Sequence, residues 1–282
     1  MKLALDSFSY HLHLGKHWFV PAQPRDLRWY AETCRQLGVA GLHIDPLHID
    51  LSREVDWLAE YARRHGLFVE LGAIGTSPEA LAAPLAAAER VGAKVLRTFI
   101  GGSCAEGRAA TAARAAQARR ELARSVTLAE QHGVVIALEN HMDIFLEDLL
   151  EILKIDSPFL GICYDSGNFA AVGEDPLQAL AALRERVACT HLKDACPAGQ
   201  YADAPSYGLS GTAVHFCALG EGNLPLLQIV QRLRQAQGED MPLTLEICTP
   251  FRHTLPESDL LAWEAENVAR SVKYAREVLG IS

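Results

Sequence analysis

Residues 134–140 read VVIALEN, and two later runs share the pattern: FLGICYD at 159–165 and VACTHLK at 187–193. Each run starts with apolar residues and ends in polar or ionisable ones. A strand of a parallel sheet is buried on both faces, so its sequence is near-continuously apolar, as these runs are at their start. Stretches of helical period lie between the runs, and this alternation predicts consecutive βα units.

The same alternation extends over the rest of the chain. Five further strands are expected at 3–8, 39–45, 67–73, 94–100 and 243–248. Helices are expected near 25–37, 52–65, 78–91, 106–132, 145–154, 176–185, 223–236 and 257–279. Ser77-Pro78 and Asp175-Pro176 are typical helix starts, with a capping side chain followed by proline. Gly38, Gly66, Gly92 and Gly133 each stand where a helix is expected to end.

Eight βα units in 282 residues predict a single-domain (β/α)₈ TIM barrel over residues 1–282. The alternative is an open, doubly wound sheet. That fold usually has a glycine-rich phosphate turn after its first strand, and residues 6–10 (DSFSY) contain no glycine. Residues 195–222, rich in Gly, Pro, Ser and Ala, are expected to form a long loop over the active-site face.

Composition narrows the functional classes. There are 26 Lys and Arg against 35 Asp and Glu, a formal charge of −9, which argues against nucleic-acid or anionic-membrane binding. No apolar run reaches the roughly 18–20 residues that a membrane helix needs. The N-terminus has an acid at Asp6 and does not read as a signal peptide. The seven cysteines form no C-x-x-C pair, so we expect buried, reduced thiols in a cytoplasmic protein.

Four ionisable residues stand near the ends of consecutive predicted strands: Glu139, Asp165, His191 and Glu246. Each lies in an apolar run, where an uncompensated charge would be costly. The carboxyl ends of barrel strands meet at one face, so these side chains should converge there. Three carboxylates and one imidazole suit a divalent ion such as Mn²⁺, Mg²⁺ or Co²⁺ better than a structural zinc.

The chain also resembles a known family. The segments that carry the resemblance, in family order, are ALENH at 137–141, CYDSGN at 163–168, THLKD at 190–194, LGEG at 219–222 and LEI at 245–247. They are similar to those of the sugar phosphate isomerase/epimerase family. This family belongs to the xylose-isomerase-like TIM-barrel superfamily, with ketose 3-epimerases, hydroxypyruvate isomerase, inosose dehydratase and endonuclease IV. The resemblance covers essentially the whole chain.

The resemblance implies that Glu139, Asp165, His191 and Glu246 bind one divalent metal, with Mn²⁺ preferred and Mg²⁺, Co²⁺ or Zn²⁺ as alternatives. It also implies that Glu139 and Glu246 act as acid and base on opposite faces of a metal-bound enediolate. Two positions depart from the ketose 3-epimerases. Asn168 stands where they usually have His, and Lys193-Asp194 stands where an Arg tends to follow. The substrate contacts therefore differ from those of the epimerases.

Further strand-end residues are candidates for substrate contacts: His11, His43, Glu70, Arg97, His141, Asn168 and Lys193. Each has a simpler alternative. His11 is equally compatible with a surface loop, Glu70 and Arg97 could pair with each other, and Lys193 could be a solvated lysine. Tyr207 and His215 lie in the long loop and could belong to a lid.

These observations predict a metal-dependent isomerase or epimerase of a small keto sugar or sugar acid. The alternative is a lyase on the same scaffold: a dehydratase, a decarboxylase or a 3-keto-glycoside-cleaving enzyme. An abasic-site endonuclease would need extra histidine ligands, and a non-catalytic binding barrel would be expected to lose a metal ligand; neither feature is seen. The expected partner is a small carbohydrate, without nucleic acid or membrane, and a homo-oligomer stays open.

Overall fold

The computed structural model describes residues 1–282, and eight parallel strands form its centre. They are β1 (Lys2–Asp6), β2 (Gly41–Ile44), β3 (Phe68–Gly72), β4 (Val95–Thr98), β5 (Val135–Glu139), β6 (Leu160–Asp165), β7 (Val187–His191) and β10 (Pro242–Leu245). Each strand pairs with the next along the chain, and β10 pairs with β1. A bridge between Leu192 and Leu245 joins β7 to β10 and closes the barrel. The predicted single-domain TIM barrel is confirmed.

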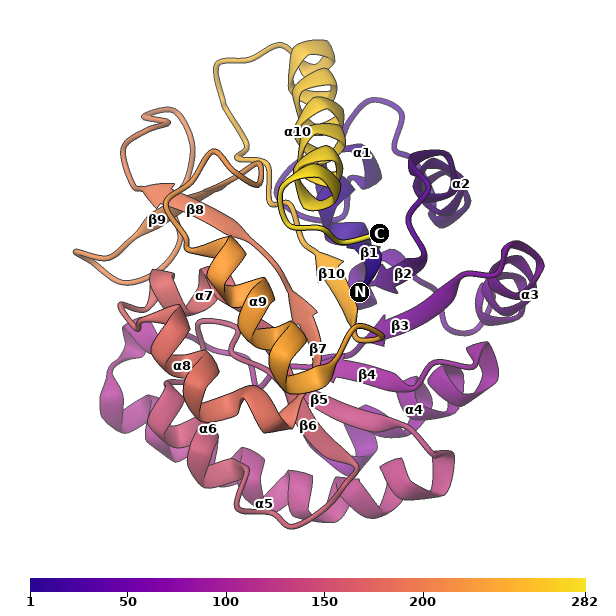
Figure 1. Cartoon of the computed structure of the whole chain (residues 1–282), viewed down its shortest axis with the longest axis vertical. Coiled ribbons are helices and arrows are strands. Elements are labelled where there is room, and N and C mark those ends of the chain that lie inside the picture. Colours follow the sequence, from indigo (N-terminus) through magenta and orange to yellow (C-terminus); the bar gives the residue numbers. More distant parts are fainter.

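An outer layer of helices covers the barrel (Figure 1). Its members are α2 (Leu27–Leu37), α3 (Val55–His65), α4 (Pro78–Val91), α5 (Arg108–His132), α6 (Leu146–Ile152), α8 (Pro176–Leu183), α9 (Leu226–Gln237) and α10 (Glu257–Glu277). Ser77 caps α4 by accepting a hydrogen bond from the Ala80 amide, and Asp175 caps α8 in the same way. Gly92 and Gly133 end α4 and α5 with positive φ, a conformation that costs glycine little.

Short helices follow several strands at the carboxyl end of the barrel. They are α1 (His11–Leu14), α7 (Ser166–Ala171) and the 3₁₀ turns η1 (Ser7–Tyr10), η2 (Pro46–His48) and η3 (Cys104–Glu106); η4 (Arg184–Arg186) precedes β7. The two chain termini lie side by side at the opposite end (Figure 1), where the Ser282 amide donates to the Met1 carbonyl.

The segment after β7 differs from the predicted loop. Asp194–Pro197 (β8) and Val214–Cys217 (β9) pair as an antiparallel ribbon, and Tyr207 pairs with Val214 beyond it. The Gly-, Pro- and Ser-rich residues lie in the connection between β8 and β9, whereas the paired residues are mostly apolar. The segment is therefore a β-hairpin that projects from the barrel (Figure 1).

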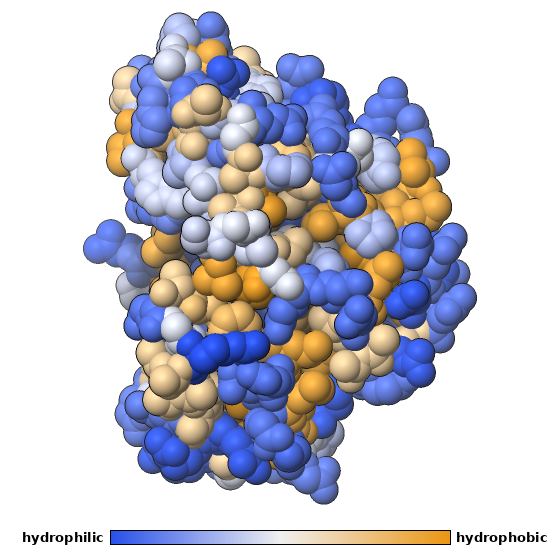
Figure 2. All heavy atoms as spheres, turned by 90° about the vertical axis from the view of Figure 1, so that its left-hand side faces the viewer, coloured by the Kyte–Doolittle hydropathy of each residue, from blue (hydrophilic) through white to orange (hydrophobic).

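The protein surface carries both hydrophilic and hydrophobic residues. On the face shown in Figure 2, hydrophobic residues reach the surface in patches between hydrophilic ones. None of the helices combines the length and the apolar character needed to traverse a lipid bilayer. All seven cysteines are free and buried, as expected from their apolar neighbours.

Candidate active site

The four predicted metal ligands converge at the carboxyl end of the barrel. Glu139, Asp165 and His191 are the last residues of β5, β6 and β7, and Glu246 directly follows β10. The register places Asp165 opposite His191. One nitrogen or oxygen atom of each of the four lies within 4.8 Å of the corresponding atoms of the others. The structure thus brings together the set that the sequence proposed, although its role as a metal site stays a prediction.

This set fits a divalent cation by its chemistry. Three carboxylates and one imidazole are all but completely buried, with Glu246 the most exposed at 5%. Buried carboxylates need a compensating cation, because they are removed from water and the apolar barrel interior cannot stabilise their negative charge. Oxygen donors with one nitrogen suit Mn²⁺ and similar ions.

Two basic side chains share the same carboxylates. Lys193 Nζ lies 2.8 Å from Asp165 Oδ2 and 3.0 Å from Glu246 Oε1. Arg97 forms an ion pair with Glu139 Oε2, and its guanidinium lies 3.7 Å from Asp45 Oδ2. His191 Nδ1 lies 2.6 Å from Glu246 Oε2 and 3.2 Å from Glu139 Oε1. Positive side chains therefore hold most of the carboxylate oxygens.

These contacts change the pKa values in opposite directions. Burial raises the pKa of Asp165 to about 7, although Lys193 opposes that rise. Burial also favours a raised pKa at Glu139, but Arg97 and His191 together hold it well below its ordinary value. For Lys193, burial is outweighed by Asp165 and Glu246, which hold its pKa well above the usual value. Lys193 is therefore a fixed positive charge.

A cavity of about 240 Å³ opens above these residues. Its polar lining residues are Asp45, Arg97, His141, Lys193 and Glu246. The remaining lining residues are mostly apolar or aromatic: Phe8, His17, Trp18, Pro46, Leu47, Ile74, Phe99, Met142, Tyr207, Phe216 and Cys248. Trp18, Leu47 and Ile74 are 43–50% exposed, and His17 is exposed as well, so these lining residues reach solvent. The cavity wall therefore combines a few charged side chains with a larger number of apolar and aromatic ones.

The predicted substrate contacts divide into two groups. Arg97, His141 and Lys193 line the cavity, and the His141 ring stacks on Phe99 with 4.1 Å between ring centroids. His11, His43, Glu70 and Asn168 are buried and do not line it. Each of these four is held by protein groups, and their role as substrate contacts stays a prediction.

The contacts of those four residues are specific. His11 Nε2 lies 3.0 Å from the Thr249 carbonyl oxygen, and Asn168 Nδ2 donates to Glu139 Oε1. His43 Nδ1 lies 3.2 Å from Glu70 Oε2. The suggested Glu70–Arg97 pair is also absent, because Glu70 contacts His43 whereas Arg97 contacts Glu139 and Asp45.

The two loop residues proposed for a lid also behave differently. Tyr207 lines the cavity, with its ring centroid 5.4 Å from that of Trp18. His215 is buried inside the hairpin, where its Nε2 accepts a hydrogen bond from the Gly199 amide. Only Tyr207 is therefore placed to contact a ligand.

Two residues at the site, Asn140 and Asp6, were given no role by the sequence analysis. Asn140 brackets the backbone of Asp165, donating to its carbonyl and accepting from its amide, each at 2.9 Å. Asp6 lies 3.2 Å from His191 Nε2. Asp6 has the same signal as the chosen ligands, an acid at the end of an apolar strand. The expected strand 3–8 hid that signal because it extended two residues beyond the observed end of β1.

Residues 76–277 match the family model of the xylose isomerase-like TIM barrel. The chain belongs to this family. It is 30% identical over 183 residues to 3-oxo-isoapionate decarboxylase of Pectobacterium atrosepticum, covering 64% of this chain and 62% of that protein. It is 36% identical over 69 residues to inosose dehydratase of Mesomycoplasma hyopneumoniae, 23% of each protein. The chain thus spans less than two thirds of either curated relative.

Solved structures share the fold over nearly the whole chain. The zinc-bound IolI protein has a TM-score of 0.71 at 18% identity, covering 97% of this chain and 98% of that one. A D-tagatose 3-epimerase-like protein has a TM-score of 0.69 at 18% identity, covering 98% and 99%. The sequence relatives are thus a decarboxylase and a dehydratase, and the likeness to the solved structures is one of fold.

Proposed function

We propose that this protein is a metal-dependent lyase that acts on a small oxo sugar or its acid derivative. The observation that carries the proposal is an asymmetry between the two glutamates. Glu246 lines the cavity, whereas Glu139 is fully buried, does not line it and is paired with Arg97. One carboxylate is therefore available to the substrate, and a lyase needs only one.

A divalent cation, with Mn²⁺ preferred, would be held by Glu139, Asp165, His191 and Glu246. When bound, it would supply positive charge beside a substrate carbonyl oxygen. Glu246 is the residue placed to move a proton at the neighbouring carbon. In a dehydration it would take up that proton and pass it to the departing hydroxyl, which leaves as water. In a decarboxylation, Glu246 would transfer a proton taken from solvent to the carbon that has lost CO₂.

The cavity charges favour an acidic substrate or an anionic intermediate. Arg97 and Lys193 both line the cavity and both are buried, at 2% and 3% exposure. A buried positive charge beside the reacting carbon stabilises negative charge that develops there. Similarity to a decarboxylase and a dehydratase supports the same reaction class.

The second candidate is the isomerase or epimerase that the sequence favoured. Its support is that Glu139 and Glu246 lie in one four-residue group, as a two-carboxylate mechanism requires. Such a mechanism needs an oxygen of each glutamate free to exchange a proton with opposite faces of the substrate. Arg97 engages Glu139 Oε2, and His191 Nδ1 and Asn168 Nδ2 both lie near Oε1. The oxygens of Glu246 also have basic neighbours, Lys193 and His191, but Glu246 lines the cavity whereas Glu139 does not. Proton exchange at Glu139 therefore requires both a change in these contacts and access from the cavity.

The test is product analysis in D₂O by NMR, using Mn²⁺-loaded protein and a panel of oxo sugars and oxo sugar acids. Loss of water or CO₂, with deuterium at the carbon next to the carbonyl, supports the lyase. An epimer or an aldose–ketose pair as the only product would contradict it. Glu246→Gln should lower the rate about 10²–10⁴-fold. The control Glu130→Gln, at an exposed position of α5, should keep wild-type activity.

A further inference from the structure

Three buried acidic or imidazole side chains lie beside the four candidate metal ligands without lining the cavity: Asp6, His43 and Glu70. They are 1%, 0% and 3% exposed. Strand register places Asp6 opposite His43 and His43 opposite Glu70. The three residues therefore form a continuous row across β1, β2 and β3.

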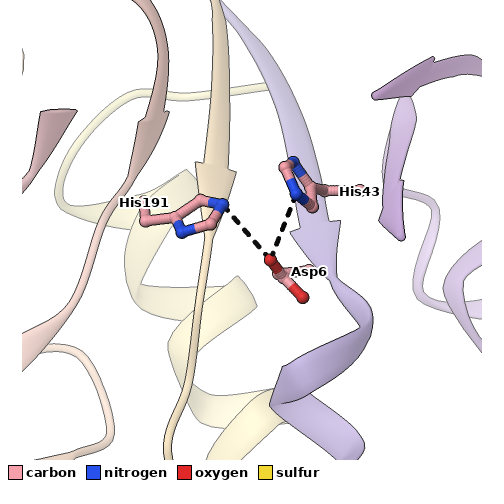
Figure 3. A group of neighbouring side chains, drawn as sticks. All are labelled: Asp6, His43 and His191. Atoms are coloured by element: carbon pink, nitrogen blue, oxygen red, sulfur yellow. Dashed lines mark ion pairs between the residues drawn. The ribbon is translucent and has the colours of Figure 1, made fainter. Parts of the chain in front are cut away.

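The row contacts the four candidate metal ligands through His191, whose two ring nitrogens both have acidic neighbours. Nδ1 faces Glu139 and Glu246, at 3.2 and 2.6 Å. Nε2 lies on the other side of the ring, 3.2 Å from Asp6 Oδ2 (Figure 3). A neutral imidazole binds a cation through one nitrogen and carries its hydrogen on the other. The group that faces Nε2 therefore decides whether Nδ1 is free.

Asp6 uses its two carboxylate oxygens differently. Oδ1 accepts a hydrogen bond of 2.6 Å from the Phe8 amide and so caps the turn that follows β1. Oδ2 faces His191 and, at 3.6 Å, His43 Nε2 (Figure 3). The backbone contact fixes the side chain, and this leaves the second oxygen directed at the imidazoles.

His43 connects Asp6 to a second fixed group. Its Nδ1 lies 3.2 Å from Glu70 Oε2, and Glu70 accepts a 2.8 Å hydrogen bond from Thr244 Oγ1. The Thr244 amide donates to Thr190 Oγ1, and Thr190 directly precedes His191. The row thus returns to the strand that carries His191, so its members restrain one another.

We propose that Asp6 is a positioning residue for His191. It holds the hydrogen of the imidazole on Nε2, which leaves Nδ1 free to bind a divalent cation, and His43 and Glu70 keep Asp6 in place. A carboxylate that accepts from the outer nitrogen of a ligating histidine fixes its tautomer and its orientation. The inference rests on the proposed metal site, but not on which bond of the substrate breaks.

Calorimetric titration with Mn²⁺ alone tests the inference without any substrate. Asp6→Asn should weaken Mn²⁺ binding about 10–100-fold, the usual effect of losing such a partner. If the asparagine oxygen keeps the Phe8 cap, its amide hydrogens face Nε2 and favour the tautomer with hydrogen on Nδ1. Asp175→Asn is the matched control, because Asp175 also caps a helix but is exposed and makes its capping contact within α8. It should bind Mn²⁺ like the wild type.

The His191 Nε2 hydrogen gives a second readout that a loss of packing alone would not move. In Zn²⁺-loaded protein with ¹⁵N-labelled histidine, the ion would hold Nδ1 and the hydrogen would lie on Nε2. In the wild type this hydrogen should exchange slowly with solvent because Asp6 accepts it, and in Asp6→Asn it should exchange faster. The His191 signals are identified by their loss in His191→Asn. Should Asp6→Asn not fold, Glu70→Gln takes its place, with a smaller loss of Mn²⁺ affinity expected.

The outcomes separate this inference from the proposed reaction. Wild-type Mn²⁺ affinity together with an unchanged exchange rate of the His191 Nε2 hydrogen in Asp6→Asn would overturn the role of Asp6. A wild type that binds no Mn²⁺ would overturn both the metal site and this inference. If the wild type binds Mn²⁺ but yields no lyase product, the proposed reaction is wrong. The role of Asp6 is then still decided by Mn²⁺ binding to Asp6→Asn.

Discussion

Lys193 Nζ lies 2.8 Å from Asp165 Oδ2, among the four residues that we propose as metal ligands. The same ammonium group lies 3.0 Å from Glu246 Oε1 and reaches the cavity. Because Asp165 and Glu246 hold the pKa of Lys193 well above its ordinary value, the lysine stays charged near neutral pH. It is placed both to compensate the carboxylates and to face negative charge on a substrate.

We expect Lys193→Met to separate these two roles. Methionine keeps much of the length but removes the charge, so turnover should fall about 10²–10³-fold, as when a donor to a developing oxyanion is lost. Mn²⁺ should bind at least as tightly, because a competing cation has gone. Steady-state kinetics and calorimetry check this. Lys154→Met, at an exposed position, is the control. Near-wild-type turnover in Lys193→Met would exclude the catalytic role.

Metal removal should lower thermal stability. An ion that binds only the folded chain stabilises it by about 2.7 kcal/mol at a concentration 100 times its Kd. For a domain of this size the melting temperature should rise by roughly 5–10 °C when Mn²⁺ is added to chelated protein. Asp165→Ala should lose this rise, and Asp156→Ala, an exposed control, should keep it. An unchanged melting temperature after confirmed metal loss would speak against a four-ligand site.

The barrel and the four converging residues were predictable because both depend on short-range patterns. Buried strands such as 134–140 are recognisable from their apolar runs, and Glu139 and Asp165 stand at strand ends that any barrel brings together. Glycine and capping signals located several helix ends, as at Gly92 and Ser77.

The remaining features depend on contacts between distant residues. The sequence offered Glu70 as a partner for Arg97, but barrel geometry directs Arg97 towards Glu139 and Asp45. Asp6 was missed because the end of β1 was placed too late. The β8–β9 hairpin was missed because its connection is dominated by loop-forming residues, which obscured two paired strands of four residues each.

His48 should make stability depend on pH. Burial lowers its pKa to about 4, from 6.5. The neutral ring lies 2.8 Å from Ser7 Oγ, which in turn accepts from the Asp45 amide. Because the unfolded state then binds more protons, this contribution is complete above pH 6.5 and is lost as the pH falls towards 4. It amounts to about 3 kcal/mol.

Urea denaturation at pH 7.5 and pH 4.5 measures this contribution. The free energy of unfolding should fall less between these values in His48→Gln than in the wild type. In the control His65→Gln, at an exposed position at the end of α3, the free energy of unfolding should fall by as much as in the wild type. Equal falls in the wild type and in His48→Gln would show that the buried ring is not the source.

The Arg97–Glu139 pair decides between the one-carboxylate and the two-carboxylate mechanism, so its strength should be measured directly. Both side chains are buried, and removing one leaves the other charge without its partner. Arg97→Met should therefore lower the free energy of unfolding of metal-free protein by about 3–5 kcal/mol, whereas Arg97→Met combined with Glu139→Gln should cost clearly less than the sum of the single changes. Chemical denaturation of the wild type, the two single variants and the double variant in chelator gives the coupling energy.

Arg97→Met could instead cost less than about 1 kcal/mol, the range of an exposed ion pair. In that case Arg97 does not hold Glu139, and Glu139 Oε2 is free to exchange a proton. The epimerase would then be the function that this site supports better.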